Sequence, residues 1–238
     1  MTNSEFITAV ERSFSEFVDS GTSRSTRKLV PLHGAIAKDM HERLGAGFGI
    51  QSQGFGLGKE GTIEGRYMGK KVDITITRDG RPVGGIAVKF VMQNYSQNAN
   101  NYFENMLGET ANIRSARCPY FQVFIIPEKL PYYSNGGAFR HWERFSESNI
   151  RKYCILDRDD PGVNLHSPDK MLIYVIRLPD IGDVRDKPEY LSRYRQKIAE
   201  TPSGHFISTV DAAHFSQSVI LNNYEAFAAK VYHAIMAL

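Results

Sequence analysis

Residues 70–92 read KKVDITITRDGRPVGGIAVKFVM, and this stretch decides the fold. Apolar residues alternate with other residues on both sides of Asp79-Gly80, a dipeptide that favours tight hairpin turns. The pattern therefore predicts two antiparallel strands, residues 70–77 and 84–92. A further strand, residues 60–67, precedes them, so that the three strands are expected to form a meander.

The alternation also predicts which side chains share a face, because successive side chains of a strand point to opposite faces. The apolar sets of the two strands reach one core only if the hairpin loop holds an odd number of residues. A loop centred near Gly80 with a glycine bulge would supply that number. Asp73 then lies opposite Gly85 or Ala87. Lys89 lies on the same side of the sheet.

The first hairpin brings a second carboxylate to this face. We expect Met68 and Gly69 to form a two-residue loop. Glu64 then lies opposite Asp73, and these carboxylates converge with Lys89. Two carboxylates can bind Mg²⁺, which takes few protein ligands and keeps several waters. A lysine beside them can orient an attacking water and stabilise charge on a phosphorane. The alternative is a solvated aspartate and lysine on a half-exposed strand.

The segment after the hairpin, residues 98–116, has the apolar spacing of an amphipathic helix. Glu109 lies at the edge of its apolar stripe, and Glu104 lies farther round the helix, nearer the N-terminal end. A glutamate at such an edge can reach a site on the sheet, although many are simply solvated. Gln97 and Asn98 lie before and inside the first turn, where their amides can cap the helix or contact phosphates.

The remaining segments predict a mixed sheet flanked by helices. Buried strands are expected at residues 120–126 and 171–178, and helices at residues 4–20, 29–44, 187–199 and 215–238. Residues 127–137 are expected to form a loop, and residues 138–157 a partly helical segment. The chain has no repeat and no linker that would divide it, so residues 1–238 are expected to form one domain.

Two other motifs carry less weight. Residues 45–61, GAGFGIQSQGFGLGKEG, do not form a phosphate-binding loop, because Glu60 follows Lys59 where Ser or Thr is required. A helix precedes them and a strand follows, which is the wrong context for a dinucleotide motif, so we expect a mobile connection. His33 and His41 lie eight residues apart on one helix. Helical metal ligands are usually three or four apart, so neither is expected to bind a metal.

Composition narrows the class of protein. The chain has 238 residues, 42% of them hydrophobic, with a net charge of +3 and a pI of about 8.8, which is compatible with a polyanionic partner. Cys118 and Cys154 belong to no Cys/His cluster, so structural zinc is not expected and a reducing compartment is indicated. No apolar run is long enough to span a membrane, and the first residues do not resemble a signal peptide. We expect a cytoplasmic protein.

The order of elements over about residues 29–126 is helix, three strands, helix, strand, which resembles the PD-(D/E)xK nuclease superfamily, especially the type II restriction endonucleases. In that family an acidic residue on the second strand is followed by Asp or Glu, any residue and Lys on the third. Here KVDITI supplies Asp73, with Val72 where the family often has proline. IAVKF supplies Lys89.

The chain departs from the family at Ala87, which stands where the second carboxylate is expected. Some restriction enzymes lack that carboxylate and use a glutamate of the following helix. Glu104 lies close to the family spacing, Glu109 is the alternative, and Glu64 is a third candidate. The departure leaves open a catalytically inactive DNA-binding module on the same fold. The fold also serves other defence and repair nucleases, and an α/β protein with unrelated chemistry is the third interpretation.

The resemblance implies an α/β fold with a restriction-endonuclease-like mixed β-sheet core (αβββαβ) flanked by helices. It implies Mg²⁺-dependent hydrolysis of phosphodiester bonds in double-stranded DNA. Asp73 and Glu104 would ligate the metal, and Lys89 would position or help to deprotonate the attacking water. Restriction enzymes of this size usually act as homodimers on palindromic sites. A cognate DNA methyltransferase encoded nearby would accompany such an enzyme without binding it.

Residues 127–238 are expected to recognise DNA, to form the dimer, or both. The segment around Trp142 mixes aromatic side chains with basic ones that can read guanine edges or bind phosphates, namely Arg140, Arg144, Arg151 and Lys152. The alternative is an amphipathic helix with Trp142 in the core and the charges in water. A polar segment nearer the N-terminus can form a phosphate-contacting arm with Arg24, Arg27 and Lys28.

Overall fold

The fold is seen in a computed structural model, which describes residues 1–22, 26–200, 207–208, 215 and 218–238. Its helices are α1 (Asn3–Ser20), the 3-10 helix η1 (Thr26–Leu29), α2 (Val30–Leu44), α3 (Tyr95–Arg114), α4 (Glu147–Leu156), α5 (Lys187–Glu200) and α6 (Tyr224–Met236). Its strands are β1 (Gly49–Ser52), β2 (Gly61–Glu64), β3 (Gly69–Val72), β4 (Ile74–Arg78), β5 (Arg81–Phe90), β6 (Tyr120–Pro127), β7 (Lys129–Tyr133), β8 (Phe139–Arg144), β9 (Lys170–Arg177), β10 (Ile207–Ser208) and β11 (Val219–Leu221).

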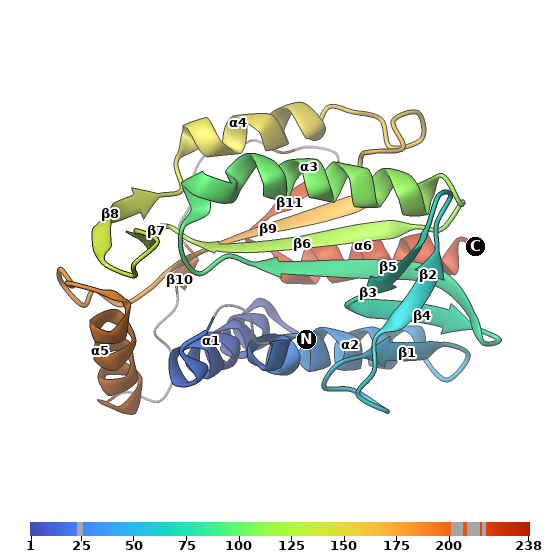
Figure 1. Cartoon of the computed structure of the whole chain (residues 1–238). Coiled ribbons are helices and arrows are strands. Elements are labelled where there is room, and N and C mark those ends of the chain that lie inside the picture. Colours follow the sequence, from blue (N-terminus) through green and yellow to red (C-terminus); the bar gives the residue numbers. More distant parts are fainter. Residues whose placement is uncertain (23–25, 201–206, 209–214, 216–217) are drawn as a thin grey trace.

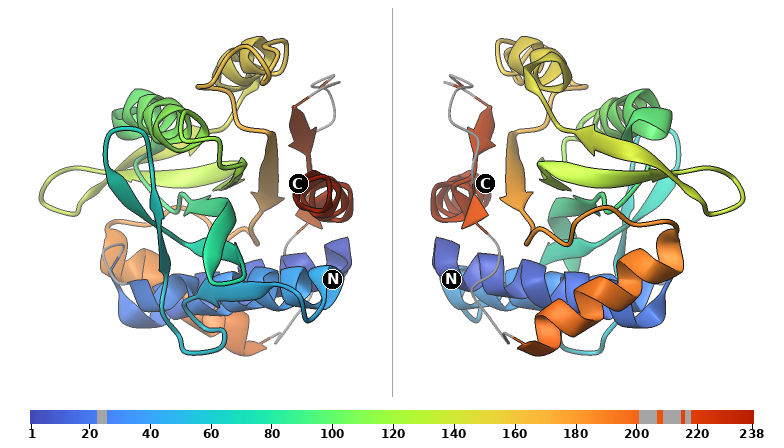
Figure 2. Two further views of the ribbon diagram at one scale, coloured as in Figure 1. Left: turned by 90° about the vertical axis from the view of Figure 1, so that its right-hand side faces the viewer. Right: turned by 90° about the vertical axis from the view of Figure 1, so that its left-hand side faces the viewer.

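A mixed sheet runs through the middle of the molecule. Its strands follow the order β1-β4-β5-β6-β9-β10, and β11 pairs with β9. β1, β4 and β5 are antiparallel to one another, whereas β5, β6 and β9 are parallel. α3 and α4 lie on one side of the sheet and α1 and α2 on the other (Figure 1). The side views show α6 next to β9 and α5 next to α1 (Figure 2). The predicted α/β class with a mixed, helix-flanked sheet is confirmed.

Two apolar cores hold these layers together. On one face, buried side chains of α1, α2 and α6 pack against alternate residues of the sheet. On the other face, a second core joins the sheet to α3 and α4. β6 and β9 supply both cores, which explains why every residue of Tyr120–Pro127 is buried. Strands covered on both faces read as continuous apolar runs, as the predicted buried strands do here.

The side chains of the β4–β5 hairpin lie on the predicted faces of the sheet, but the turn that joins the strands differs from the predicted one. Asp79 and Gly80, with φ values of 51° and 74°, form a two-residue loop of the kind that suits twisted strands. The extra residue is Val83, which forms a β-bulge opposite the step from Ile76 to Thr77. The predicted odd-numbered loop was therefore wrong. The predicted common core is confirmed for Ile74 and Ile76 with the apolar residues of β5, whereas Val72 of β3 lies in a separate small cluster.

The predicted meander is interrupted at Asp73. β3 ends there and pairs with β2 in a separate two-stranded hairpin. Glu64 pairs with Gly69, so its predicted position opposite Asp73 was wrong. The place beside β4 is taken by β1, which lies inside the glycine-rich segment that was expected to be a mobile connection. Ser52 of β1 stabilises the interruption, because its hydroxyl donates to the Asp73 carbonyl oxygen at 2.7 Å.

Two later segments also differ from their predictions. The expected loop at residues 127–137 contains β7, which pairs with β8, and the helical part of residues 138–157 is confined to α4. The helix predicted at residues 215–238 begins only at α6. The apolar run Val219–Leu221 pairs with β9 instead, because it completes a sheet edge that a helix would leave unpaired.

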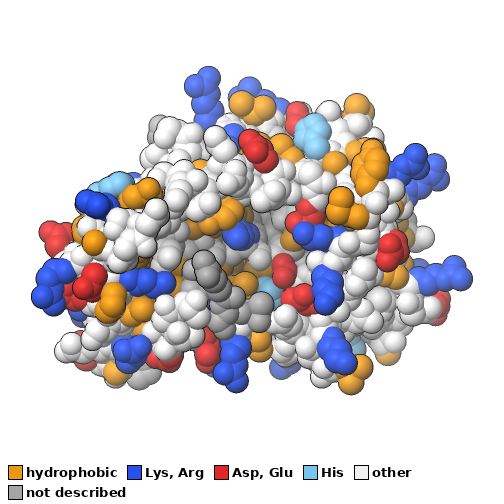
Figure 3. Space-filling model, viewed as in Figure 1, with side chains coloured by type: hydrophobic (Ala, Val, Ile, Leu, Met, Phe, Trp, Pro, Cys, Tyr) orange, Lys and Arg blue, Asp and Glu red, His pale blue; other side chains and the backbone are white. Residues whose placement is uncertain are grey.

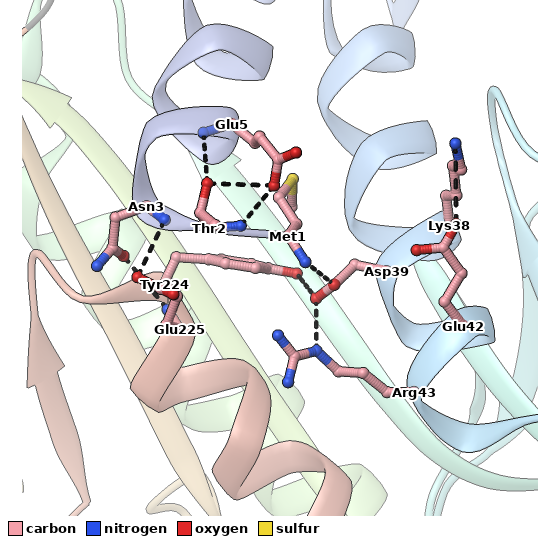
Figure 4. Close-up of polar contacts among 10 residues, drawn as sticks. All are labelled: Met1, Thr2, Asn3, Glu5, Lys38, Asp39, Glu42, Arg43, Tyr224 and Glu225. Atoms are coloured by element: carbon pink, nitrogen blue, oxygen red, sulfur yellow. Dashed lines mark hydrogen bonds and ion pairs between the residues drawn. The ribbon is translucent and has the colours of Figure 1, made fainter.

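Three further predicted helices are confirmed, namely residues 4–20, 29–44 and 187–199. Asp39 of α2 connects this helix to α6 and to Met1, which precedes α1 (Figure 4). Its carboxylate accepts hydrogen bonds from the Tyr224 hydroxyl at 2.8 Å, from Arg43 Nε at 2.9 Å and from the backbone nitrogen of Met1.

In the described part of the chain, none of the helices has the length and apolar character needed to cross a membrane.

Candidate active site

A cleft of about 750 Å³ lies between α3 and the sheet, beside the β2–β3 hairpin. Acidic and basic side chains gather in this hollow below α3 (Figure 3). Its lining includes four residues singled out from the sequence, namely Asp73, Lys89, Glu104 and Glu109. Ala87 lies among them, as the register predicted. Glu64 does not line the cleft; it is exposed, with its carboxylate folded over Gly69.

Asp73 occupies the break between β3 and β4. Its Oδ2 accepts a hydrogen bond from the Val88 N–H at 2.7 Å. Burial raises the pKa of Asp73 to about 6; the hydrogen bond from Val88 opposes this shift, and the charge of Glu109 adds to it. The ionised carboxylate is therefore incompletely compensated by the protein, a condition that is common at functional sites.

Lys89 lies on β5 at the mouth of the cleft. Its side chain as a whole is exposed, yet Nζ lies 4.5 Å from the centre of the Tyr102 ring on α3, within cation–π range. Desolvation by the surrounding protein lowers the pKa of Lys89, while Asp73 and Glu109 act to raise it. Asp73 and Glu109 are thus close enough for their charges to act on the Lys89 ammonium group.

The two glutamates of α3 differ in how they are held. Glu109 is partly buried; its Oε1 accepts a hydrogen bond from the Tyr120 hydroxyl at 2.8 Å and lies 3.5 Å from Lys70 Nζ. Its charge acts on the pKa of Asp73. Glu104 is exposed, and its charge acts on Lys152 of α4. Both line the cleft, but the contacts favour Glu109 as the partner of Asp73, whereas the family spacing pointed to Glu104.

Two further groups lie beside Asp73 that the sequence analysis did not select. His33 Nε2 lies 4.0 Å from Asp73 Oδ1, and one ligand atom each from His33, Glu60 and Asp73 lie within 4.8 Å of one another. Burial lowers the pKa of His33 to about 4, so the ring is uncharged at neutral pH. No spacing in the sequence could have revealed this cluster, because its members come from a helix, a loop and a strand break.

Lys70 and Lys71 of β3 also line the cleft and were not selected from the sequence. The available signal was their position next to Asp73, since Lys71 falls on the same side of the predicted strand. Lys70 lies half exposed beside Glu109, and Lys71 is exposed. They place positive charge along the edge of the cleft that the β2–β3 hairpin forms.

The basic residues predicted to bind DNA lie outside the cleft lining. Arg140 and Arg144 belong to β8 rather than to a helix, and Arg144 pairs with Glu128 at 3.7 Å. Arg151 and Lys152 belong to α4, where Lys152 donates to a backbone carbonyl of α3 at 2.8 Å. Arg140 and Arg151 are exposed, so their contacts with DNA stay predictions.

The start of α3 is capped from a distant strand. α3 begins at Tyr95, and Glu143 of β8 accepts hydrogen bonds from the N–H groups of Tyr95 and Ser96 at 2.7 and 3.1 Å. A carboxylate suits the positive end of a helix dipole. The predicted capping by Gln97 and Asn98 was therefore wrong, and their contact with phosphates stays a prediction.

The predicted basic arm near the N-terminus is only partly described. Arg24 lies outside the described residues. Arg27 is exposed on η1. Lys28 is buried, with Nζ 5.9 Å from the centre of the Phe17 ring. Contact of this segment with phosphate stays a prediction.

The comparisons with known proteins identify no relative. No protein-family model matches the chain, and no curated protein or solved structure matches it. The function must therefore be argued from the cleft and its charged groups.

Proposed function

We propose that this protein is a Mg²⁺-dependent DNA endonuclease of the PD-(D/E)xK type, acting as a sequence-specific restriction enzyme on double-stranded DNA. One observation carries the proposal. Asp73 from a strand break, Lys89 from the adjacent strand and Glu109 from the following helix meet in one cleft. These are groups that can hydrolyse a phosphodiester with a bound metal ion, and a glutamate on the helix after the lysine is the arrangement of those family members that lack the carboxylate at the position of Ala87.

The donor groups fit a hard divalent cation. Asp73 and Glu109 supply carboxylate oxygens, which Mg²⁺ prefers as ligands. Burial and the neighbouring carboxylate disfavour the charge on Asp73, and a bound cation would relieve both effects. Asp73 and Glu109 would hold the ion, with Glu104 at the outer part of the cleft. The ion would neutralise charge on the scissile phosphate and lower the pKa of a bound water.

The protein's own groups complete the site. Lys89 presents its ammonium group at the cleft mouth, where it can orient a water and stabilise negative charge on the phosphorane. The Tyr102 ring restrains this ammonium group from the opposite wall. The Tyr120 hydroxyl fixes Glu109. Lys70 and Lys71 can bind phosphates flanking the cleaved bond, because phosphate contacts position a protein on DNA.

The proposal is tested with unmethylated phage DNA, Mg²⁺ or EDTA, and the variants Lys89→Ala and Lys38→Ala. Lys38 is exposed on α2, pairs with Glu42 and does not line the cleft, so it is a matched control. We expect discrete fragments with the wild-type protein and Lys38→Ala in Mg²⁺. Lys89→Ala and EDTA should abolish them. Cleavage that persists in EDTA or in Lys89→Ala would overturn the proposal.

A catalytically inactive DNA-binding module is the second candidate, and Ala87 is the residue that favours it. In that case intact DNA would be accompanied by a mobility shift at low salt that Asp73→Ala leaves unchanged. An unrelated α/β protein would give neither cleavage nor a shift. The same gel therefore separates the three interpretations.

The restriction-enzyme proposal includes a homodimer on a palindromic site, with a cognate methyltransferase encoded nearby and a cytoplasmic location. A two-fold protein matches a two-fold DNA sequence. Light scattering on the purified chain should give twice the 26.9 kDa mass of one copy. A monomer at micromolar concentration that stays a monomer on DNA would contradict this part of the proposal.

A further inference from the structure

His33 is the least satisfied polar side chain near the cleft. It is 2% exposed on α2, and neither Nδ1 nor Nε2 has a hydrogen-bond partner among the described residues. Buried polar atoms are almost always satisfied, so an orphaned imidazole calls for an explanation. Its Nε2 faces Asp73 Oδ1 at 4.0 Å, too far for a hydrogen bond. The gap between them is the space that a bridging ion would occupy.

The third group, Glu60, is brought there by a close contact between backbones. A Cβ added at Gly34 of α2 would lie 2.6 Å from the Gly54 carbonyl oxygen, so the loop can approach the helix only because both residues are glycines. Gly54 has a φ of +78°, which also favours glycine. Gln53 then donates to Glu60 Oε1 at 2.9 Å and holds the carboxylate beside the helix.

We propose that His33, Glu60 and Asp73 form a second cation position, which binds a first-row transition-metal ion such as Mn²⁺ in preference to Mg²⁺. The ligand atoms lie within 4.8 Å of one another. Metal–nitrogen and metal–oxygen bonds of about 2.0–2.2 Å separate ligands on opposite sides of one ion by about 4 Å, so the three groups are spaced closely enough to share an ion. Imidazole is a ligand for transition metals, whereas Mg²⁺ sites are built from oxygen.

Asp73 belongs to both positions. Its Oδ1 faces His33, and Oδ2 accepts the Val88 N–H. The carboxylate therefore connects the cleft to the His33 side, and the transition-metal position adjoins the reaction that we propose for the cleft. Its part in cleavage rests on the proposed function, whereas binding of the ion does not.

The test uses the full chain and Mn²⁺ alone, observed by pulsed electron paramagnetic resonance. An imidazole ligand couples its nitrogen nucleus to bound Mn²⁺, so the spectrum reports histidine directly. The variants are His33→Leu, which fills the buried space with an apolar side chain, and Glu60→Gln, on a half-buried loop. His41→Gln is the matched control, because His41 is exposed on the same helix and lies outside the cluster.

We expect nitrogen coupling in the wild type and in His41→Gln, and its loss in His33→Leu. Glu60→Gln should weaken Mn²⁺ binding by about tenfold or more. Bound Mn²⁺ without nitrogen coupling, or no Mn²⁺ binding, would overturn the inference. If His33→Leu fails to fold, Glu60→Gln decides, and wild-type affinity in that variant counts against the site. Cleavage is assayed separately in Mg²⁺, so nitrogen coupling without cleavage would refute the proposed function and leave the metal position standing.

Discussion

The two faces of β5 are built for opposite purposes. Ile86, Val88 and Phe90 point into the core beneath α1, α2 and α6, where each is buried. Ala87 and Lys89 alternate with them and line the cleft below α3. One strand of ten residues thus supplies both the packing that stabilises the sheet and the lysine of the candidate site.

The contrast extends to the free energy of each face. Burial of the apolar residues stabilises the fold by about 1.5–3 kcal/mol for each large side chain. On the cleft side, burial raises the pKa of Asp73 to about 6, and His33 lacks hydrogen-bond partners in the described structure. Both features destabilise the folded protein. Local destabilisation of this kind is expected where function, rather than folding, selects the residues.

The largest expected effect is on the cleavage rate, and it concerns the two glutamates of α3 that line the cleft side of the sheet. Glu109→Gln should reduce cleavage by about 10²- to 10³-fold, because it removes one of the two carboxylates proposed to hold the metal ion in the cleft. Glu104→Gln should have a smaller effect, since Glu104 is exposed toward α4. Single-turnover rates in saturating Mg²⁺ provide the measurement. If Glu104→Gln proves the more damaging change, the family spacing was the better guide and the contacts in the cleft were misleading.

Substitutions on the apolar face of β5 should lower the stability of the fold. Ile86→Ala should lower the free energy of unfolding by about 2–5 kcal/mol, as large-to-small changes in a packed core do. Lys89→Ala, on the same strand, should change it by less than about 0.5 kcal/mol. Urea denaturation followed by circular dichroism gives both values. Equal losses in the two variants would show that Lys89 supports the fold, which would weaken its assignment to the chemistry.

The sequence predicted those parts of the site that depend on local periodicity. Alternation along the strands was enough to place Asp73 and Lys89 on the cleft side, and helical spacing placed Glu109 at the edge of its apolar stripe. The predicted faces for the side chains of β4 and β5 were right although the predicted loop was wrong. A bulge at Val83 and an odd-numbered loop have the same effect on register. Periodicity is thus a stronger constraint than turn type.

The parts that failed depend on contacts between distant segments. Nothing local shows that β1 would displace β2 from the sheet, so Glu64 was placed opposite Asp73 in error. His33 and Glu60 meet Asp73 only because two glycine backbones touch, and that contact has no periodic signature. Loop glycines were interpreted as mobility, whereas one of them provides close packing.

A smaller effect concerns the pH dependence of stability. The pKa of Asp73 rises from its ordinary value of 3.8 to about 6 on folding, so its stabilising contribution is complete below pH 4 and is lost as the pH rises through 6. Asp73→Asn removes this loss. In EDTA the variant should therefore gain up to about 3 kcal/mol over the wild type at pH 8 and little at pH 4. Thermal melts at the two pH values supply the measurement. A variant less stable at pH 8 would show that the ionised carboxylate is well compensated.

The smallest expected effect is on the salt dependence of DNA binding, and it tests which of the two hairpins, β2–β3 or β7–β8, contacts DNA. Lys71 is exposed on the cleft lining, whereas Arg144 of β8 is paired with Glu128 at 3.7 Å. A residue that neutralises one phosphate contributes about 0.9 to the slope of log affinity against log salt concentration. Lys71→Ala should therefore lower that slope by about one, and Arg144→Ala by less, because Arg144 lies outside the cleft lining and shares Glu128 with Arg177. Fluorescence anisotropy between 50 and 200 mM salt measures both slopes. The reverse order would move the DNA away from the β2–β3 hairpin and onto β8, and would restore the role that the sequence assigned to Arg144.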